Sequence, residues 1–230
     1  MIVIIGGTSG IGLQTAQYLK AQNKDVLVGG RHTIKDDIDY KFLDVTDEAS
    51  IKAFFEAIAS SPIEALIYSV GITIGQKSIK EFDKNIFENI IDVNVTGALL
   101  CLKYAYDSLA KNKAKVVIVN SLASRTFSAF SGVEYTMSKS ALSGMVKQLS
   151  VEFAEDNIMI NSIFPSMTAT PMLVENVSKE KLAQIEKTIP MKRVAKPLEV
   201  AKAIEFLISK DNTYMTGCGI DLNGGQFLNG

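Results

Sequence analysis

Short apolar runs alternate along the chain with longer stretches in which apolar positions recur at helical spacing. The apolar runs predict strands at 2–5, 26–28, 40–43, 65–70, 115–119, 158–164 and 219–222. Most of these runs contain almost no polar residue, which is typical of strands buried on both faces of a sheet. The longer stretches predict helices at about 10–22, 47–60, 81–110 (with a break), 133–155 and 197–209.

The regular alternation of strands and helices predicts the fold class, because such connections are right-handed crossovers between parallel strands. We expect an α/β fold: a single Rossmann-type doubly wound domain over residues 1–230. A central parallel sheet of about seven strands should carry helices on both faces. Only the segment 165–196 breaks the pattern, with a scattered helical signal in SKEKLAQIEK. Long loops in compact domains are usually functional, so we expect this segment to be a substrate flap.

Composition and charge are those of a globular protein. The chain is 47% hydrophobic and 21% charged, and its formal net charge is −1 without any basic run. We therefore expect no nucleic-acid partner and no contact with an anionic membrane surface. No apolar run approaches the ~18 residues of a membrane span, and no signal peptide is recognisable. These features predict a cytoplasmic protein.

Cysteine and histidine are too sparse for metal or redox chemistry. Cys101 and Cys218 lie far apart in no metal-binding spacing, so we expect both to be reduced and structural. His32 is the single histidine, and any Ser-His-Asp hydrolase would depend on it. A histidine-rich metal site is excluded, and we expect no metal.

A glycine-rich turn, IGGTSGIG, follows the first predicted strand and opens the first predicted helix. Its glycines have the spacing G-x-x-x-G-x-G. Glycine permits the backbone conformations of the turn and the close approach of a pyrophosphate, which then lies at the helix N-terminus. The turn therefore predicts a dinucleotide site. Its members are Gly6, Thr8, Ser9, Gly10, Ile11 and Gly12.

The end of the second strand, VLVGGRH, bears on the choice of dinucleotide. An NAD site usually places a carboxylate here to hold the adenosine ribose, but this chain has Gly30 followed by Arg31. A guanidinium can bind a 2′-phosphate that a carboxylate would repel. We therefore favour NADP(H), with NAD(H) as the alternative. After the third strand, Asp44 can accept a hydrogen bond from the adenine amino group, or it can cap the next helix, as Asp47 or Thr46 can.

The segment EYTMSKSAL places Tyr135 and Lys139 four residues apart, on one face of a helix. A cation beside a phenol lowers its pKa from about 10, which makes the phenol a usable acid near neutral pH. The alternative is an ordinary amphipathic pair. Ser121 ends a strand where parallel sheets place their active sites. Asn94 interrupts an apolar helical pattern, and a buried amide there needs partners.

These motifs, with INSIFPSMTATPM and TGCGIDLNGG, resemble the short-chain dehydrogenase/reductase superfamily over nearly the whole chain. The overall appearance is closest to small bacterial 3-oxoacyl-carrier-protein reductases. The resemblance implies a catalytic tetrad of Asn94, Ser121, Tyr135 and Lys139. It also implies cofactor contacts from Val45, Ser69, Gly71, Tyr135, Lys139, Pro165, Thr168 and Thr170.

Three positions depart from the family pattern. The family's N-N-A-G is Tyr68-Ser69-Val70-Gly71, so an amide that braces the sheet is missing. The interval from Ser121 to Tyr135 is 14 residues, one longer than in near relatives, and the family's P-G turn is Pro165-Ser166. Beside this site, Arg125 could hold a substrate phosphate or carboxylate, but we expect it to be an exposed surface residue.

We expect an NADP(H)-dependent oxidoreductase that interconverts a carbonyl and a secondary alcohol by hydride transfer, with Tyr135 as general acid/base. In the family-based picture Ser121 orients the carbonyl, Lys139 also holds the nicotinamide ribose, and Asn94 helps hold a proton-relaying water. The alternatives are an NAD-preferring alcohol dehydrogenase and a non-catalytic nucleotide-binding regulatory protein. The expected partner is a small carbonyl or alcohol substrate. The family also implies a homodimer or homotetramer, formed through the helices around 94–110 and 135–154.

Overall fold

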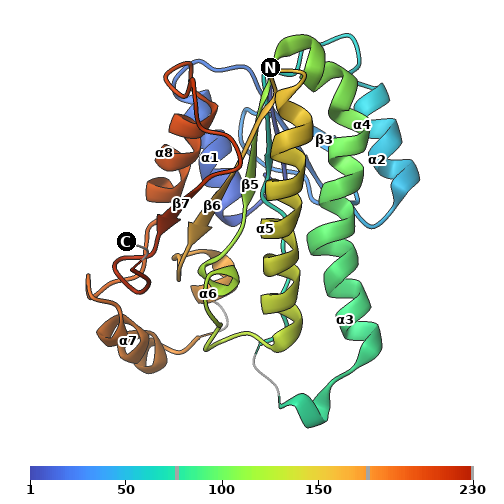
Figure 1. Cartoon of the computed structure of the whole chain (residues 1–230). Coiled ribbons are helices and arrows are strands. Elements are labelled where there is room, and N and C mark those ends of the chain that lie inside the picture. Colours follow the sequence, from blue (N-terminus) through green and yellow to red (C-terminus); the bar gives the residue numbers. More distant parts are fainter. Residues whose placement is uncertain (76–77, 175–176, 229–230) are drawn as a thin grey trace.

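A computed structural model of the chain describes residues 1–75, 78–174 and 177–228 (Figure 1). Seven parallel strands form one sheet in the order β3-β2-β1-β4-β5-β6-β7. The strands are β1 (Ile2–Ile5), β2 (Val26–Gly30), β3 (Asp39–Phe42), β4 (Ala65–Tyr68), β5 (Lys115–Val119), β6 (Met159–Pro165) and β7 (Gly219–Leu222). The predicted fold class is confirmed. The strand predicted at 65–70 ends at Tyr68, two residues earlier than expected.

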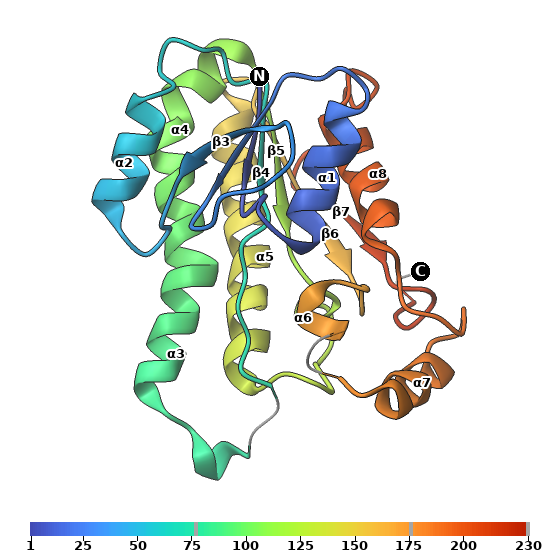
Figure 2. The same cartoon turned by 180° about the vertical axis from the view of Figure 1, so that it is seen from behind.

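Helices cover both faces of the sheet (Figure 2). One face carries α1 (Gly10–Lys20) and α8 (Pro197–Ile208), and the other carries α2 (Glu48–Glu56), α4 (Gly97–Asn112) and α5 (Val133–Ala154). Alternate residues of β1 enter opposite cores: Val3 and Ile5 pack toward α2, α4 and α5, whereas Ile2 and Ile4 pack toward α1 and α8. This explains the uninterrupted apolar runs, since side chains of a strand alternate between its faces.

The break predicted within 81–110 is a single turn of π-helix. The chain forms α3 (Lys84–Ile91), the π-turn η2 (Asp92–Thr96) and then α4. By length and composition alone, the combined stretch Lys84–Asn112 is long and apolar enough to cross a membrane, which the apolar runs in the sequence did not indicate. Its buried side chains, among them Cys101, Leu102 and Leu109, belong to the core between α4 and the sheet.

The strand order reverses between β1 and β4, the point beyond whose carboxyl ends open parallel sheets place their ligand sites. Several short helices surround this end of the sheet (Figure 1): η1 (Ile79–Glu81), η3 (Leu122–Ser124), α6 (Pro171–Val174) and α7 (Lys179–Thr188). The predicted flap 165–196 thus contains two helices, of which α7 carries the SKEKLAQIEK signal. The Thr168–Ala195 bridge joins the two ends of this segment.

Candidate active site

The glycine turn between β1 and α1 brings backbone segments unusually close together. Gly6 has a φ of 80°, and a Cβ on Gly12 would lie 2.3 Å from the Gly6 carbonyl oxygen. Ser9 is the N-cap of α1 but makes no capping hydrogen bond with its side chain. The first amide groups of α1 thus keep donors for an external acceptor, which suits a phosphate. Ile11 packs on the core below.

Thr8 of the same turn closes the position where an NAD site carries its carboxylate. A Cβ on Gly30 would lie only 2.7 Å from the methyl group of Thr8, so Gly30 has no room for a side chain unless Thr8 moves. The next residue, Arg31, is exposed. The structure therefore offers a guanidinium and no carboxylate at the end of β2.

Asp44 and Val45 follow β3 at the same edge. One carboxylate oxygen of Asp44 accepts hydrogen bonds from the backbone amide and hydroxyl of Thr46, at 2.9 and 2.8 Å. The Thr46 amide hydrogen bond is the main cause that lowers the pKa of Asp44, and the charge of Arg31 adds to it. The N-cap of α2 is Asp47, not Asp44. Val45 is buried, and its side chain is directed into the core.

The backbone after β4 lies between the glycine turn and α5. The amide of Ser69 donates to Ile5 at 2.8 Å, and a Cβ on Gly6 would touch the Ser69 backbone. A Cβ on Gly71 would lie 3.2 Å from Lys139 Nζ and 3.7 Å from Asn94 Oδ1. Gly71 therefore lies next to Lys139 and Asn94, two of the catalytic residues predicted from the sequence.

Tyr135 and Lys139 lie on the first turns of α5. Lys139 Nζ is 5.7 Å from the centroid of the Tyr135 ring and donates a hydrogen bond to the carbonyl of Val119 at 3.1 Å. Lys139 is only 3% exposed, and burial lowers the pKa of its ammonium from 10.5 to about 8. The pair therefore shares one face of the helix at the carboxyl end of β5.

The pKa of Tyr135 shifts in the direction opposite to the one predicted from the sequence. We expected the lysine charge to lower it, but burial raises the pKa of Tyr135 above 10, and a hydrogen bond with Ser121 offsets only part of this. Desolvation dominates because the phenolate would lose its hydration and Lys139 directs its proton to Val119 instead of to the phenol oxygen. Burial therefore outweighs the lowering of the Tyr135 pKa that we expected from Lys139.

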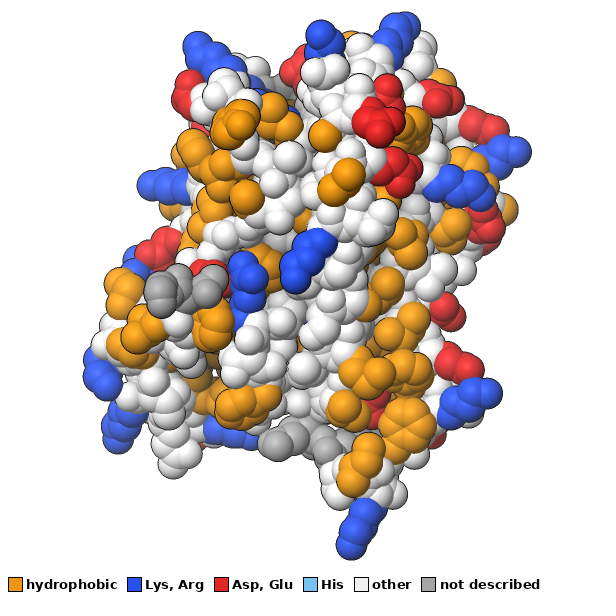
Figure 3. Space-filling view, in the orientation of Figure 1, with side chains coloured by type: hydrophobic (Ala, Val, Ile, Leu, Met, Phe, Trp, Pro, Cys, Tyr) orange, Lys and Arg blue, Asp and Glu red, His pale blue; other side chains and the backbone are white. Residues whose placement is uncertain are grey.

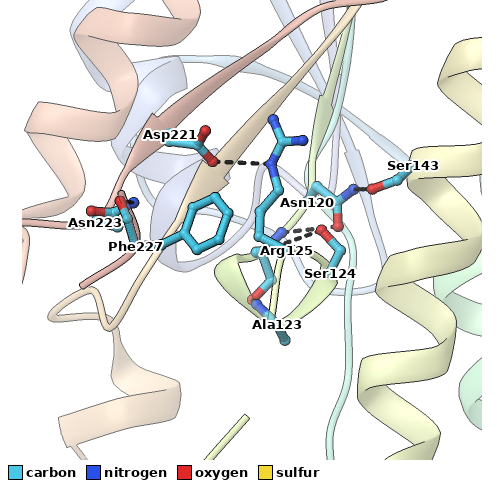
Figure 4. A network of polar contacts seen from close by, with 9 residues as sticks. Asn120, Ala123, Ser124, Arg125, Ser143, Asp221, Asn223 and Phe227 are labelled. Carbon is cyan, nitrogen blue, oxygen red and sulfur yellow. Dashed lines mark hydrogen bonds and ion pairs between the residues drawn. The ribbon is translucent and has the colours of Figure 1, made fainter. Parts of the chain in front are cut away.

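Ser121 follows β5 and begins the short helix η3. Its hydroxyl accepts a hydrogen bond from Ala123 at 3.1 Å and contacts the Tyr135 phenol, despite the interval of 14 residues. Asn120 fixes this segment on α5: it accepts from the Ser121 amide and donates to Ser143 at 3.0 Å (Figure 4). Asn120 carries no motif signal that singles it out in the sequence, although a polar residue at the end of an apolar strand is a general hint.

Arg125 differs from the expectation of an exposed residue, because its guanidinium pairs with Asp221 and is only partly exposed. Its Nε donates to Asp221 on β7 at 3.1 Å (Figure 4). Its guanidinium lies 3.8 Å from the centroid of the Phe164 ring. The two charged side chains are 25% and 20% exposed. Arg125 folds over the sheet because Asp221 and Phe164 offer both an anion and an aromatic face there.

Asn94 lies in the π-turn and is fully buried. Its amide oxygen accepts from the Ile72 amide at 2.8 Å, and its amide nitrogen donates to the Ile72 carbonyl at 3.1 Å and to Ser138 Oγ at 2.9 Å. Ser138 in turn donates to the carbonyl of Tyr135 at 2.8 Å. Sequence reasoning found Asn94 but missed Ser138, which lies on α5 between Tyr135 and Lys139.

The segment after β6 reaches the glycine turn. The Thr170 methyl group lies 3.4 Å from where a Cβ on Gly10 would be. Pro165 is the last residue of β6 and is buried. Thr168 is 7% exposed, and its hydroxyl donates a hydrogen bond to the carbonyl of Ser166 at 3.0 Å. Of the three, Thr170 is therefore the one that contacts the predicted dinucleotide loop.

Over residues 1–75, 78–174 and 177–228, no cluster of three or more His, Cys, Asp or Glu could hold a metal ion. Cys101 is buried, and Cys218 is exposed; both are free thiols. Burial raises the pKa of the Cys101 thiol far above its ordinary value, so this group stays protonated. The polar chemistry of the described site rests on the tyrosine, lysine, serine and asparagine side chains.

Comparison with known proteins agrees with the fold and identifies the family. Residues 6–226 match the family model described as enoyl-(acyl carrier protein) reductase. The uncharacterized oxidoreductase YgfF of Escherichia coli K12 is 30% identical over 243 residues, covering 97% of this chain and 98% of the relative. The 3-oxoacyl-[acyl-carrier-protein] reductase MabA of Mycobacterium tuberculosis H37Rv is 30% identical over 231 residues, covering 98% and 92%.

Solved structures extend this comparison to three dimensions. ElxO with NADP bound superposes with a TM-score of 0.90 at 27% identity, covering 98% of this chain and 97% of the other. The ligand-free aldohexose dehydrogenase of Thermoplasma acidophilum also gives 0.90, at 25% identity, covering 98% and 93%. The chain therefore belongs to the short-chain dehydrogenase/reductase family of oxidoreductases.

Proposed function

We propose that this chain is an NADP(H)-dependent oxidoreductase that interconverts a carbonyl and a secondary alcohol. The observation that carries the proposal is the meeting of four side chains at the carboxyl end of the sheet, beside the glycine turn. Tyr135 contacts Ser121, while Lys139 and Asn94 both border Gly71. Four segments far apart in the sequence thus converge next to a loop suited to a dinucleotide.

Each side chain has a role that its chemistry allows. A bound nicotinamide supplies or accepts the hydride at the carbonyl carbon. Tyr135 gives its phenolic proton to the carbonyl oxygen during reduction and takes it back during oxidation, a step that contributes roughly 10²–10⁴ in rate. Ser121 donates a hydrogen bond that orients the carbonyl. Lys139 holds the nicotinamide ribose, and its charge stabilises the phenolate as it forms.

The residues around the glycine turn fit a dinucleotide. The close contact at Gly12 leaves the backbone free to approach a pyrophosphate, and the α1 amides without a side-chain cap can bind its oxygens. The remaining cofactor contacts that we propose come from Thr8, Ser9, Gly10, Ile11, Asp44, Val45, Ser69, Pro165, Thr168 and Thr170. Segment 165–196, with α6 and α7, is the proposed flap over the substrate.

The preference for NADP(H) is supported by the end of β2. Thr8 leaves no room for a side chain at Gly30, and the next residue is Arg31, which is exposed and can bind a 2′-phosphate. ElxO, a structural relative, is known with NADP bound. Two alternatives remain. An NAD-preferring dehydrogenase would bind NAD⁺ more tightly than NADP⁺, and a non-catalytic nucleotide-binding protein would bind a cofactor without turning over substrate.

Thermal-shift titration with NADP⁺ and NAD⁺ tests the cofactor. A ligand of the native state raises the melting temperature, so NADP⁺ should raise it at lower concentration than NAD⁺. Arg31→Ala should remove most of this difference, whereas the control Lys35→Ala, another exposed cation nearby, should retain it. A stronger shift with NAD⁺ would overturn the preference, and no shift with either would overturn the oxidoreductase proposal.

The substrate class is tested by NADPH consumption with β-ketoacyl thioesters, keto sugars, quinones and small ketones. Turnover of any of these supports the catalytic proposal. Binding of NADP⁺ without turnover across the panel would favour the non-catalytic alternative. A cytoplasmic location and a small-molecule carbonyl or alcohol partner are part of this proposal.

We further propose a homodimer or homotetramer. The outer surfaces of α4 and α5 include exposed or small residues such as Leu99, Met137, Gly144 and Val151. Figure 3 views this face and has apolar side chains gathered over α3 and the beginning of α5. Apolar patches of this kind favour association between protein surfaces.

A further inference from the structure

Tyr68 occupies the last position of β4, where the family pattern has an amide that braces the sheet. Its side chain is 1% exposed, and its hydroxyl donates a hydrogen bond to the carbonyl of Val93 at 2.7 Å. Burial raises the pKa of Tyr68 well above 10, so the hydroxyl stays protonated and remains a donor. A buried phenol normally has such a partner, but this partner is the residue directly before Asn94.

The hydroxyl of Tyr68 binds the π-turn between α3 and α4. Val93 belongs to the π-turn Asp92–Thr96, and α4 begins directly afterwards at Gly97. A Cβ on Gly97 would lie 2.8 Å from the Tyr68 hydroxyl and 2.9 Å from the Val45 carbonyl oxygen. Gly97 therefore leaves the room in which the phenol approaches the helix. Insertion of a side chain at such a turn is a recognised cause of irregular helix geometry, and π-turns frequently occur at functional sites.

Asn94 transmits the position of this turn to α5. Its amide bonds both backbone groups of Ile72 and the hydroxyl of Ser138, and Ser138 bonds the carbonyl of Tyr135. All of these distances lie between 2.8 and 3.1 Å. A continuous set of hydrogen bonds and one peptide unit thus connects the Tyr68 hydroxyl with the turn that carries Tyr135.

We propose that Tyr68 is a positioning residue of the active site: its hydroxyl holds the π-turn so that Asn94 is fixed between the loop after β4 and α5. This inference rests on the proposed function, since it concerns the same catalytic side chains. The phenol thus ties the end of β4 to the helix through the Val93 carbonyl. Without it, the Val93 carbonyl loses its partner and the turn is free to rearrange.

The variant Tyr68→Phe tests this inference, because it removes one oxygen atom and keeps the buried ring. We expect kcat to fall roughly three- to tenfold, the range of one net hydrogen bond, and the pH profile of kcat to shift. The KM for NADPH should stay within about twofold of its original value, because the glycine turn is untouched. The matched control is Tyr104→Phe on α4, which removes the hydroxyl that binds Glu48 at the surface; it should change neither kcat nor the pH profile.

Hydrogen exchange of the ligand-free protein gives a readout that does not depend on activity. Tyr68→Phe should speed exchange in peptides that contain Asn94 and Ile72, whereas Tyr104→Phe should not. Unchanged exchange there, or an unchanged pH profile and kcat, would overturn the inference. Equal losses of kcat and of NADPH affinity would also overturn it, since they would mean general destabilisation. If the unmodified protein consumed no NADPH, the proposed function would fail, while the exchange result would still decide the Tyr68 contact.

Discussion

At the scale of single residues, burial sets the properties of the tyrosine–lysine pair. Lys139 is almost inaccessible and hydrogen-bonds to Val119, and the same burial raises the pKa of Tyr135 and lowers that of Lys139. Both shifts disfavour the charged forms, as desolvation requires. Burial therefore moves both side chains toward their neutral forms.

The replacement Lys139→Met should stabilise the ligand-free protein at neutral pH. The pKa of Lys139 falls from 10.5 to about 8 on folding, so the unfolded chain binds the proton more tightly. This penalty is fully present below pH 8 and disappears as the pH rises from 8 to 10.5. At about 1.4 kcal/mol per pKa unit, it amounts to roughly 3 kcal/mol, and the lost hydrogen bond to Val119 offsets about 1 kcal/mol of the gain.

Melting temperatures of the two proteins between pH 7 and pH 10 measure this effect. A net gain of about 2 kcal/mol corresponds to a rise of roughly 4–8 °C for a chain of this length. The difference should shrink toward pH 10, while turnover of the variant should be lost at every pH. A variant that melts at or below the original temperature at pH 7 would show that Lys139 does not destabilise the fold.

Tyr135→Phe should abolish most turnover and leave NADP⁺ affinity nearly unchanged. The ring and its packing remain, and only the proton donor is removed, so the loss should be about 10²-fold or more. Steady-state kinetics and the thermal shift with NADP⁺ separate the two effects, with Tyr18→Phe on α1 as a surface control. Near-normal turnover would refute the role that we assign to Tyr135.

At the scale of elements, the loop that carries Ser121 is fixed to two neighbours. Asn120 ties it to α5 through Ser143, and Arg125 ties it to β7 through Asp221 while lying on Phe164. These two anchors hold the loop where Ser121 meets Tyr135 across an interval of 14 residues.

Arg125→Met tests the second anchor, because methionine keeps an apolar stem over Phe164 and removes the charge. A partly buried ion pair with an aromatic contact should contribute about 1–2 kcal/mol, so the melting temperature should fall by roughly 2–8 °C. Lys103→Met removes an exposed pair with Glu48, whose side chains are 61% and 51% exposed, and should change the melting temperature little. Equal effects of both variants would show that Arg125 anchors nothing.

At the scale of the whole molecule, the outer side of α5, which faces away from the sheet, is exposed at Gly144. Gly144 lies on the outer side of α5, and a Cβ there would have no neighbour within 4 Å in the single chain. A side chain at this position is therefore compatible with the folded subunit but not with a closely packed partner helix. A substitution at Gly144 can therefore test association without disturbing the fold of the subunit.

Gly144→Lys should leave the subunit folded and weaken the proposed oligomer. Sedimentation or light scattering should find the unmodified protein as a dimer or tetramer of 25.0 kDa chains and the variant shifted toward the monomer. The control Gln22→Lys, on an exposed position after α1, should not alter the mass. A monomeric unmodified protein, or a variant with an unchanged mass, would argue against association through α5.

The amino-acid sequence by itself determined the parallel sheet, its helices and the glycine turn, because these follow from local periodicity and from backbone geometry that only glycine permits. The tyrosine–lysine spacing likewise fixed a shared helix face. Only the tertiary structure decided the direction of the Tyr135 pKa, the attachment of Arg125 to Asp221 and the entry of Tyr68 into the helix before Asn94. Burial and hydrogen-bond partners depend on contacts between segments far apart in the chain, and no local pattern encodes them.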